Sequence, residues 1–184
     1  MRRRTVSVIG GRAQNTDVTS LILAKAVGAE IGRRGYGLIS GGDDGIAAAA
    51  NAGCIEAGGQ TLALLKWNRL TDCGPNVTWA IPTSMDLARS NILNWSGDGV
   101  IAFAGAFGTL GEIALALDTE RPLVILGEPA YLRLPATALV PRCAVLPSPT
   151  PDDVTAILDT LEALIDTGVL PPVRPDVDPT VALR

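Results

Sequence analysis

The chain has 184 residues, of which 47% are hydrophobic, enough for one well-buried domain and too few for two of ordinary size. Its formal net charge is −4 and its pI is near 4.8, so it lacks the basic surplus with which proteins hold nucleic acid, and we expect no such partner. Histidine is absent, which excludes Ser–His–Asp and Cys–His catalysis and histidine-ligated metal sites.

The start of the chain and its cysteines indicate a cytoplasmic protein. Val6 to Ile9 is followed at once by Gly10 and Gly11, unlike a signal peptide. The cysteines are odd in number, widely spaced and without a CxxC pair, which suits a reducing compartment and predicts no metal site; they are Cys54, Cys73 and Cys143. Glycines and Glu112 interrupt the apolar run Gly99 to Leu117, so we expect no membrane partner.

An apolar strand followed by a glycine turn and a helix occurs three times. The strands are Thr5 to Ile9, Leu38 to Ser40 and Val100 to Phe103, and the turns begin at Gly10, Gly41 and Gly105. Leu62 to Leu65 and Leu123 to Leu126 are further strands. This order predicts an α/β, Rossmann-like doubly wound fold with a mainly parallel sheet. Because parallel strands end at one edge, the three turns should line one crevice.

Helices are predicted from their capping residues and terminating glycines. They are Thr19 to Arg34 before Gly35, Ile46 to Ala57 before Gly58, a helix capped by Ser84 through Asn94, one capped by Thr109 through Asp118, and Val154 to Thr167 after Thr150-Pro151-Asp152-Asp153. Four prolines lie within residues 170–184. We therefore expect a single domain over residues 1–169 and a proline-rich tail over 170–184.

The segment Gly105, Ala106, Phe107, Gly108, Thr109 is the strongest candidate for a binding site. Two glycines and a hydroxyl around a strand-to-helix turn supply N–H donors, and the helix dipole adds partial positive charge, so a phosphate fits there. A plain tight turn with a threonine N-cap is the alternative for an isolated turn of this kind.

Two charged residues near this turn have a structural and a functional interpretation. Glu112 lies three residues after Thr109 and could complete a capping box, or its carboxylate could face the crevice and contact ribose or an oxocarbenium-like centre. Arg89 is either a surface arginine with a packed stem or a clamp for phosphate or carboxylate.

The other two glycine turns are candidates for contact with the same ligand. Gly10, Gly11 and Arg12 could close over it or simply form a turn, and Gly41, Gly42 and Asp43 precede a helix that Asp43 and Asp44 are expected to cap, unless they contact hydroxyls or a metal. Asn91 could bond the ligand or bridge backbone. The tryptophans are expected in the core or at an interface; they are Trp67, Trp79 and Trp95.

The segment IPTSMDLARSNILNWSGDGVIAFAGAFGTLGEIALAL, with SVIGGRA and SGGDDGIAAAANAGCIEAGG before it, resembles the molybdenum-cofactor carrier proteins, which belong with the Lonely Guy (LOG) phosphoribohydrolases. The resemblance covers most of Thr5 to Leu126. AGAFGTLGE matches the LOG signature PGGxGTxxE at Gly105, Gly108, Thr109 and Glu112, and departs from it at Ala104 and Ala106.

The resemblance implies two functions. The first is binding or carrying a phosphate-bearing pterin or nucleotide, with the molybdenum cofactor as ligand. The alternative is hydrolysis of a nucleoside 5′-monophosphate to free base and ribose 5-phosphate, with Arg89 and Glu112 as the catalytic residues. Ser90, where LOG enzymes carry a basic residue, and Ala106 favour the carrier. The resemblance also implies a homo-oligomer, a dimer or tetramer.

Overall fold

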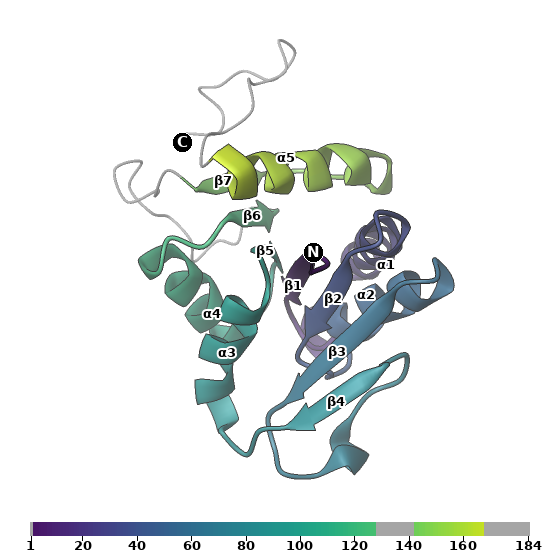
Figure 1. Ribbon diagram of the computed structural model, residues 1–184, viewed down its shortest axis with the longest axis vertical. Coiled ribbons are helices and arrows are strands. Elements are labelled where there is room, and N and C mark those ends of the chain that lie inside the picture. Colours follow the sequence, from purple (N-terminus) through teal and green to yellow (C-terminus); the bar gives the residue numbers. More distant parts are fainter. Residues whose placement is uncertain (1, 128–141, 168–184) are drawn as a thin grey trace.

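A parallel sheet in the strand order β4-β3-β2-β1-β5-β6-β7 forms the centre of the fold (Figure 1). The computed structural model describes residues 2–127 and 142–167. The strands are β1 (Thr5–Ile9), β2 (Gly37–Ser40), β3 (Gln60–Leu65), β4 (Trp79–Pro82), β5 (Gly99–Phe103), β6 (Leu123–Leu126) and β7 (Cys143–Leu146). The α-helices are α1 (Val18–Arg33), α2 (Ile46–Glu56), α3 (Arg89–Ser96), α4 (Phe107–Asp118) and α5 (Val154–Thr167). Short 3-10 turns are η1 (Ala13–Asn15), η2 (Leu70–Asp72), η3 (Asp86–Ala88) and η5 (Pro151–Asp153).

The order in which strands are added to the sheet reverses between β1 and β5. From β1 it builds outward through β2, β3 and β4, then returns to pair β5 with the other side of β1, so that Val6 lies opposite Gly99 and Ile9 opposite Ala102. In such sheets the loops on the two sides of the reversal separate and leave a crevice at the carboxyl ends of the strands. The predicted doubly wound, Rossmann-like fold is confirmed.

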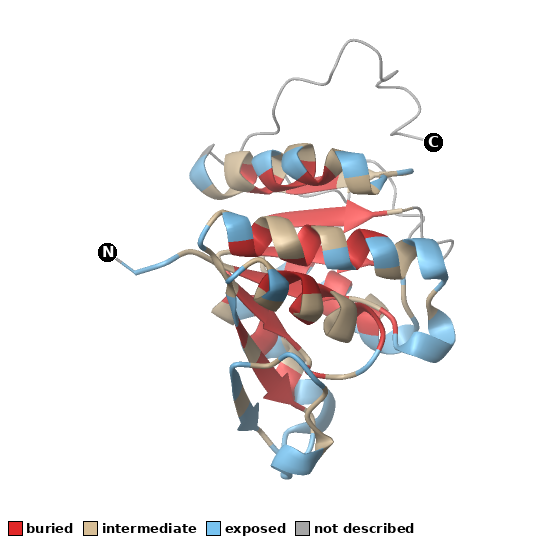
Figure 2. Cartoon of the chain, turned by 90° about the vertical axis from the view of Figure 1, so that its right-hand side faces the viewer, coloured by how far each residue is buried: buried red, intermediate tan, exposed pale blue. Residues whose placement is uncertain are grey.

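Helices cover both faces of the sheet (Figure 1). Helices α1, α2 and α5 pack on one face with Val6 and Val8, and α4 and α3 pack on the other with Ile9 and Val100. The alternation along β1 thus sends its apolar side chains into two separate cores. Figure 2 shows the buried strands between helices that expose their outer sides. None of the helices in the described ranges is long and apolar enough to cross a bilayer.

Two strands and one helix boundary differ from the sequence prediction. The prediction lacked the edge strands β4 and β7. Strand β4 is mostly exposed and ends at Pro82, and β7 is followed by Pro147 instead of a glycine turn, so neither carries the pattern of a buried strand before a turn. It also placed a helix from Ser84 to Asn94. Instead Ser84 has a positive φ of 56°, η3 intervenes, and α3 runs from Arg89 to Ser96.

The helix caps show both successes and errors. Thr150 caps the start of the last helical segment as expected and forms a capping box with Asp153, and Gly35 and Gly58 have the positive φ expected after α1 and α2. The prediction that Asp43 or Asp44 caps α2 is wrong, because its N-cap is Gly45 with no side-chain cap hydrogen bond. The predicted tail, residues 170–184, and the predicted domain end at residue 169 lie outside the described residues.

Candidate functional site

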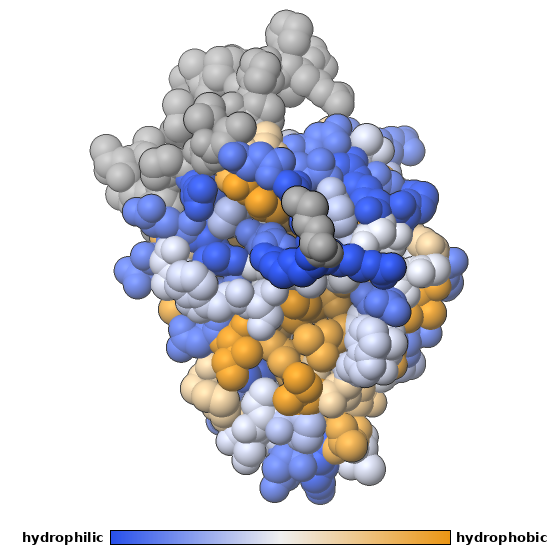
Figure 3. All heavy atoms as spheres, viewed as in Figure 1, coloured by the Kyte–Doolittle hydropathy of each residue, from blue (hydrophilic) through white to orange (hydrophobic). Residues whose placement is uncertain are grey.

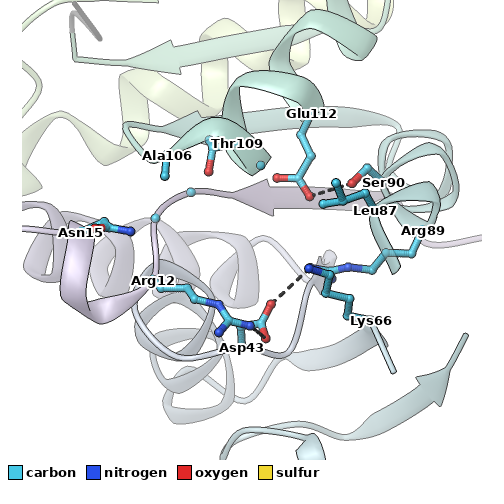
Figure 4. Close-up of a pocket in the computed structure, with 13 residues that line it drawn as sticks. Arg12, Asn15, Asp43, Lys66, Leu87, Arg89, Ser90, Ala106, Thr109 and Glu112 are labelled. Atoms are coloured by element: carbon cyan, nitrogen blue, oxygen red, sulfur yellow. Dashed lines mark hydrogen bonds and ion pairs between the residues drawn. The ribbon is translucent and has the colours of Figure 1, made fainter. Parts of the chain in front are cut away.

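A pocket of about 180 Å³ lies where β1 and β5 diverge, at the carboxyl edge of the sheet. The loops after β1, β2 and β3 contribute to it, together with α3 and the start of α4 (Figure 4). Its lining residues are Gly10, Gly11, Arg12, Asn15, Asp43, Lys66, Leu87, Arg89, Ser90, Ala106, Gly108, Thr109 and Glu112. The expected convergence of the three glycine turns is therefore partly met. The turn after β1 lines the pocket through Gly10 and Gly11, whereas the turns after β2 and β5 line it through Asp43 and Ala106.

Backbone hydrogen bonds tie these turns together. The Gly11 amide donates to the Ala104 carbonyl (3.0 Å), and the Ile46 amide, at the start of α2, donates to the Gly11 carbonyl (3.1 Å). A Cβ on Gly105 would lie 2.2 Å from Thr109 Oγ1 and 2.9 Å from the Gly11 amide nitrogen. Glycine is required at position 105 because any larger residue would separate the β1 and β5 turns.

The first turn of α4 presents backbone amides to the pocket. The N-cap is Ala106, whose side chain cannot accept a hydrogen bond, and the helix begins at Phe107. The prediction that Thr109 caps this helix is therefore wrong: Thr109 is its third residue and is buried. Unbonded first-turn amides and the dipole of a 12-residue helix favour an oxyanion at this end.

Asp43 lies between two arginines beside this helix start. One carboxylate oxygen is 2.8 Å from Arg12 Nη2 and the other is 3.2 Å from Arg89 Nη2, as drawn in Figure 4. Arg89 also donates from Nη1 to the Leu64 carbonyl (2.7 Å), and a Cβ on Gly41 would lie 2.4 Å from that nitrogen. Arg89 is only 8% exposed, so the surface-arginine interpretation is wrong. Its guanidinium is fixed at the pocket wall by backbone and carboxylate.

Glu112 is buried on α4 and faces α3 across the pocket. Ser90 Oγ donates to Glu112 Oε1 (3.2 Å), and Asn94 Nδ2 donates to the Glu112 backbone carbonyl (2.8 Å). Its carboxylate forms no capping box, because the helix starts at Phe107 rather than after Thr109. Burial raises the pKa of Glu112 above its usual range, and the charge of Arg89 and the Ser90 hydrogen bond only partly oppose this rise.

We expect Glu112→Gln to stabilise the protein at neutral pH, because glutamine removes a charge that burial disfavours. The pKa of Glu112 in the folded state lies above its reference value of 4.5. The protonated Glu112 therefore contributes its full stability below pH 4.5, and this contribution is lost as the pH rises through the folded-state pKa. Glutamine keeps the acceptor for Ser90 and carries no charge. Urea unfolding between pH 4 and 8 should show a higher free energy of unfolding for the variant than for the native protein, and this difference should shrink toward acid pH.

Glu56→Gln is the matched control, because Glu56 is exposed on α2 and forms an ion pair with the exposed Lys25. It should change stability little at any of these pH values. A loss of stability in the Glu112 variant at pH 7 would show that Arg89 compensates the buried charge.

The other predicted ligand residues are distributed unevenly around the pocket. Asn91 and Phe107 are exposed and are not among its lining residues, and Phe107 is 90% exposed. Gly41 and Gly105 lie behind the wall and make room for Arg89 and Thr109. Gly42 lines a second, adjoining pocket.

Four lining residues were not among the ligand contacts predicted from the sequence. Asn15 lies on η1, Leu87 on η3, Ser90 on α3, and Lys66 directly follows β3. Lys66 was the one with a detectable signal, since a cation at the carboxyl end of a predicted strand lies at the edge where the turns meet. Arg12, Lys66 and Arg89 give the pocket three cations against the carboxylates of Asp43 and Glu112. With the α4 amides, this arrangement suits a small ligand that carries an oxyanion.

Comparison with known proteins agrees with this architecture. A molybdenum cofactor binding protein from the phototrophic bacterium Rippkaea orientalis is 29% identical and superposes with a TM-score of 0.79 over 88% of this chain and 99% of that one. The molybdenum cofactor carrier protein of Chlamydomonas reinhardtii is 30% identical with a TM-score of 0.76 over the same shares. An uncharacterized protein from Archaeoglobus fulgidus is 33% identical over 133 residues, 72% of this chain and 85% of that protein.

These similarities confirm the resemblance to the molybdenum cofactor carrier proteins and their LOG-type superfamily. The model of one family within that superfamily matches residues 3–146, which span the sheet from β1 to β7 and every residue that lines the pocket. The chain therefore belongs to the SLOG cluster4 family.

Proposed function

We propose that this protein binds and carries a small phosphate-bearing pterin, with the molybdenum cofactor as its cargo. The observation that carries the proposal is the uncapped start of α4 beside Arg12 and Arg89 at the crevice of the sheet. Amides and guanidinium groups together are the donors that hold a terminal phosphate. The molybdenum cofactor binding protein and carrier protein that share 29% and 30% identity with this chain support the choice of cargo.

Cofactor capture tests the proposal directly. The purified protein is mixed with molybdenum cofactor released from a molybdoenzyme, separated from free cofactor by gel filtration, and assayed for molybdenum and for pterin fluorescence. We expect both in the protein fraction, and a clear loss of both in Arg12→Gln. Arg33→Gln is the matched control, because Arg33 is similarly exposed but pairs with Glu30 on α1 and is not among the residues that line the pocket. Equal retention by both variants would contradict the proposed site.

Hydrolysis of a nucleoside 5′-monophosphate is the second candidate, favoured by one observation. Glu112 lines the pocket, and burial raises its pKa, as the general acid at a glycosidic bond requires. Against it, Ser90 donates a hydrogen bond to the Glu112 carboxylate and holds it on the α3 side of the pocket. We expect no free adenine by chromatography after incubation with AMP. Adenine that appears with the native protein and disappears with Glu112→Gln would establish the hydrolase instead.

We also propose that the chain forms a dimer or tetramer through the exposed side of β4. Trp79 and Ile81 on β4, with Met85 and Ile92, are 39–54% exposed, and Figure 3 shows apolar side chains gathered on this face. Patches of this kind on a protein surface mark interaction sites. Size-exclusion chromatography with light scattering should give two or four times the 19.0 kDa chain mass, and a smaller species for Ile81→Lys. A monomer for the native protein would contradict this.

A further inference from the structure

A second pocket, of about 390 Å³, adjoins the first and shares Arg12 and Asp43 with it. Its other walls come from Gly42 and Asp44 after β2 and from the segment between β3 and β4. Figure 4 shows Arg12 and Asp43 side by side at the margin of the first pocket. A ligand with a phosphate in the first pocket can therefore extend past Arg12 into the second without leaving the protein surface.

Trp67 provides an aromatic wall in this second pocket. Its side chain is 48% exposed, and the Lys66 ammonium lies 5.1 Å from the centre of its ring. Of the two places predicted for Trp67, Trp79 and Trp95, the core is excluded because all three are about half exposed, and an interface stays a prediction. An indole that keeps much of its surface outside the core can stack on a flat heterocycle, an interaction that tolerates many ring types.

Two carboxylates in the same pocket have spare acceptor capacity. Asp44 accepts a long hydrogen bond of 3.3 Å from the Ala13 amide, and Asp72 lies 3.4 Å from Arg69 Nε. An ionised carboxylate only accepts hydrogen bonds, so it selects ring edges that carry N–H donors and disfavours edges that carry ring-nitrogen acceptors.

We propose that the second pocket binds a 2-amino-4-oxopyrimidine ring, the edge shared by guanine and pterins, stacked on Trp67 and held by Asp44 and Asp72. This ring places an N–H and an amino group side by side, so that one carboxylate can accept from both. Adenine instead offers a ring nitrogen acceptor beside its amino group, which faces a carboxylate unfavourably. The inference rests on the proposed function, since it assumes that the phosphate of the same ligand occupies the first pocket.

Calorimetric titration of the full-length protein with GMP, AMP and ribose 5-phosphate tests the second pocket. We expect GMP to bind at least about tenfold more tightly than ribose 5-phosphate, because stacking and the paired hydrogen bonds add to the phosphate contacts. AMP should bind about tenfold more weakly than GMP. Trp67→Ala should lower the affinity for GMP to the affinity for ribose 5-phosphate. Trp67→Phe should keep most of the affinity difference between these two ligands. The double variant Asp44→Asn, Asp72→Asn should remove the preference for GMP over AMP.

Ribose 5-phosphate separates the failure of this inference from failure of the proposed function. If it binds, and GMP binds no more tightly or Trp67→Ala leaves GMP unchanged, the second pocket takes no ring while the phosphate site stands. If neither GMP nor ribose 5-phosphate binds, the phosphate site itself is refuted and the inference falls with it. Weakened ribose 5-phosphate binding in Trp67→Ala would show a general structural effect and would also overturn the assignment.

Discussion

Gly28→Ala is expected to destabilise the protein by about 3 kcal/mol or more, through overpacking where α1 crosses α2. A Cβ on Gly28 would lie 1.9 Å from the Ala50 carbonyl oxygen, and one on Gly53 would lie 1.9 Å from the Lys25 carbonyl oxygen. Each helix thus places a glycine against the backbone of the other. Backbone cannot rotate away as a side chain can, so the two helices would have to separate. Urea unfolding followed by circular dichroism measures the loss.

Gly111→Ala is the matched control for this substitution. Gly111 is also inside a helix, α4, but a Cβ there would meet nothing within 4 Å. Alanine should therefore stabilise the protein by about 0.5–1 kcal/mol through its helix propensity. Similar effects of the two substitutions would show that α1 and α2 do not approach as closely as described. The crossing matters for function because the loops before α1 and α2 carry Arg12 and Asp43.

Asp43→Asn is expected to tighten the binding of ribose 5-phosphate about tenfold, if the first pocket holds the phosphate as proposed. The Asp43 carboxylate occupies the guanidinium groups of Arg12 and Arg89 and repels an incoming oxyanion. Asparagine has the same shape without the charge, so both arginines become available to the ligand. Titration calorimetry measures the affinity directly.

Asp43→Asn should also lower the stability of the folded protein when no ligand is present. Arg89 is buried, and removal of its carboxylate partner leaves a charge without compensation. Added ribose 5-phosphate should therefore raise the thermal midpoint of the variant more than that of the native protein. Asp44→Asn, with the same change in net charge but no ion pair to either arginine, is the control and should bind ribose 5-phosphate nearly as the native protein does. Weaker binding by the Asp43 variant would contradict this role.

The order of strands and helices could be predicted from the sequence because its signals are local. Apolar runs such as Val100 to Phe103 mark buried strands, and the glycines after them mark the turns. The capping box at Thr150 and Asp153 involves residues three apart, so it too was predictable. The edge strands β4 and β7 were missed because β4 is mostly exposed and ends at a proline, and because no glycine turn follows β7.

By itself, the sequence determined the parallel α/β fold, the crevice edge and the family, since these depend on patterns within a few residues and on a signature segment around Gly105 and Glu112. Only the tertiary structure decided which side chains meet there. Asp43 and Arg89 are 46 residues apart, and Ser90 and Glu112 are 22 apart. Contacts over such separations depend on the strand order and on the depth of each loop in the crevice, which no local pattern encodes.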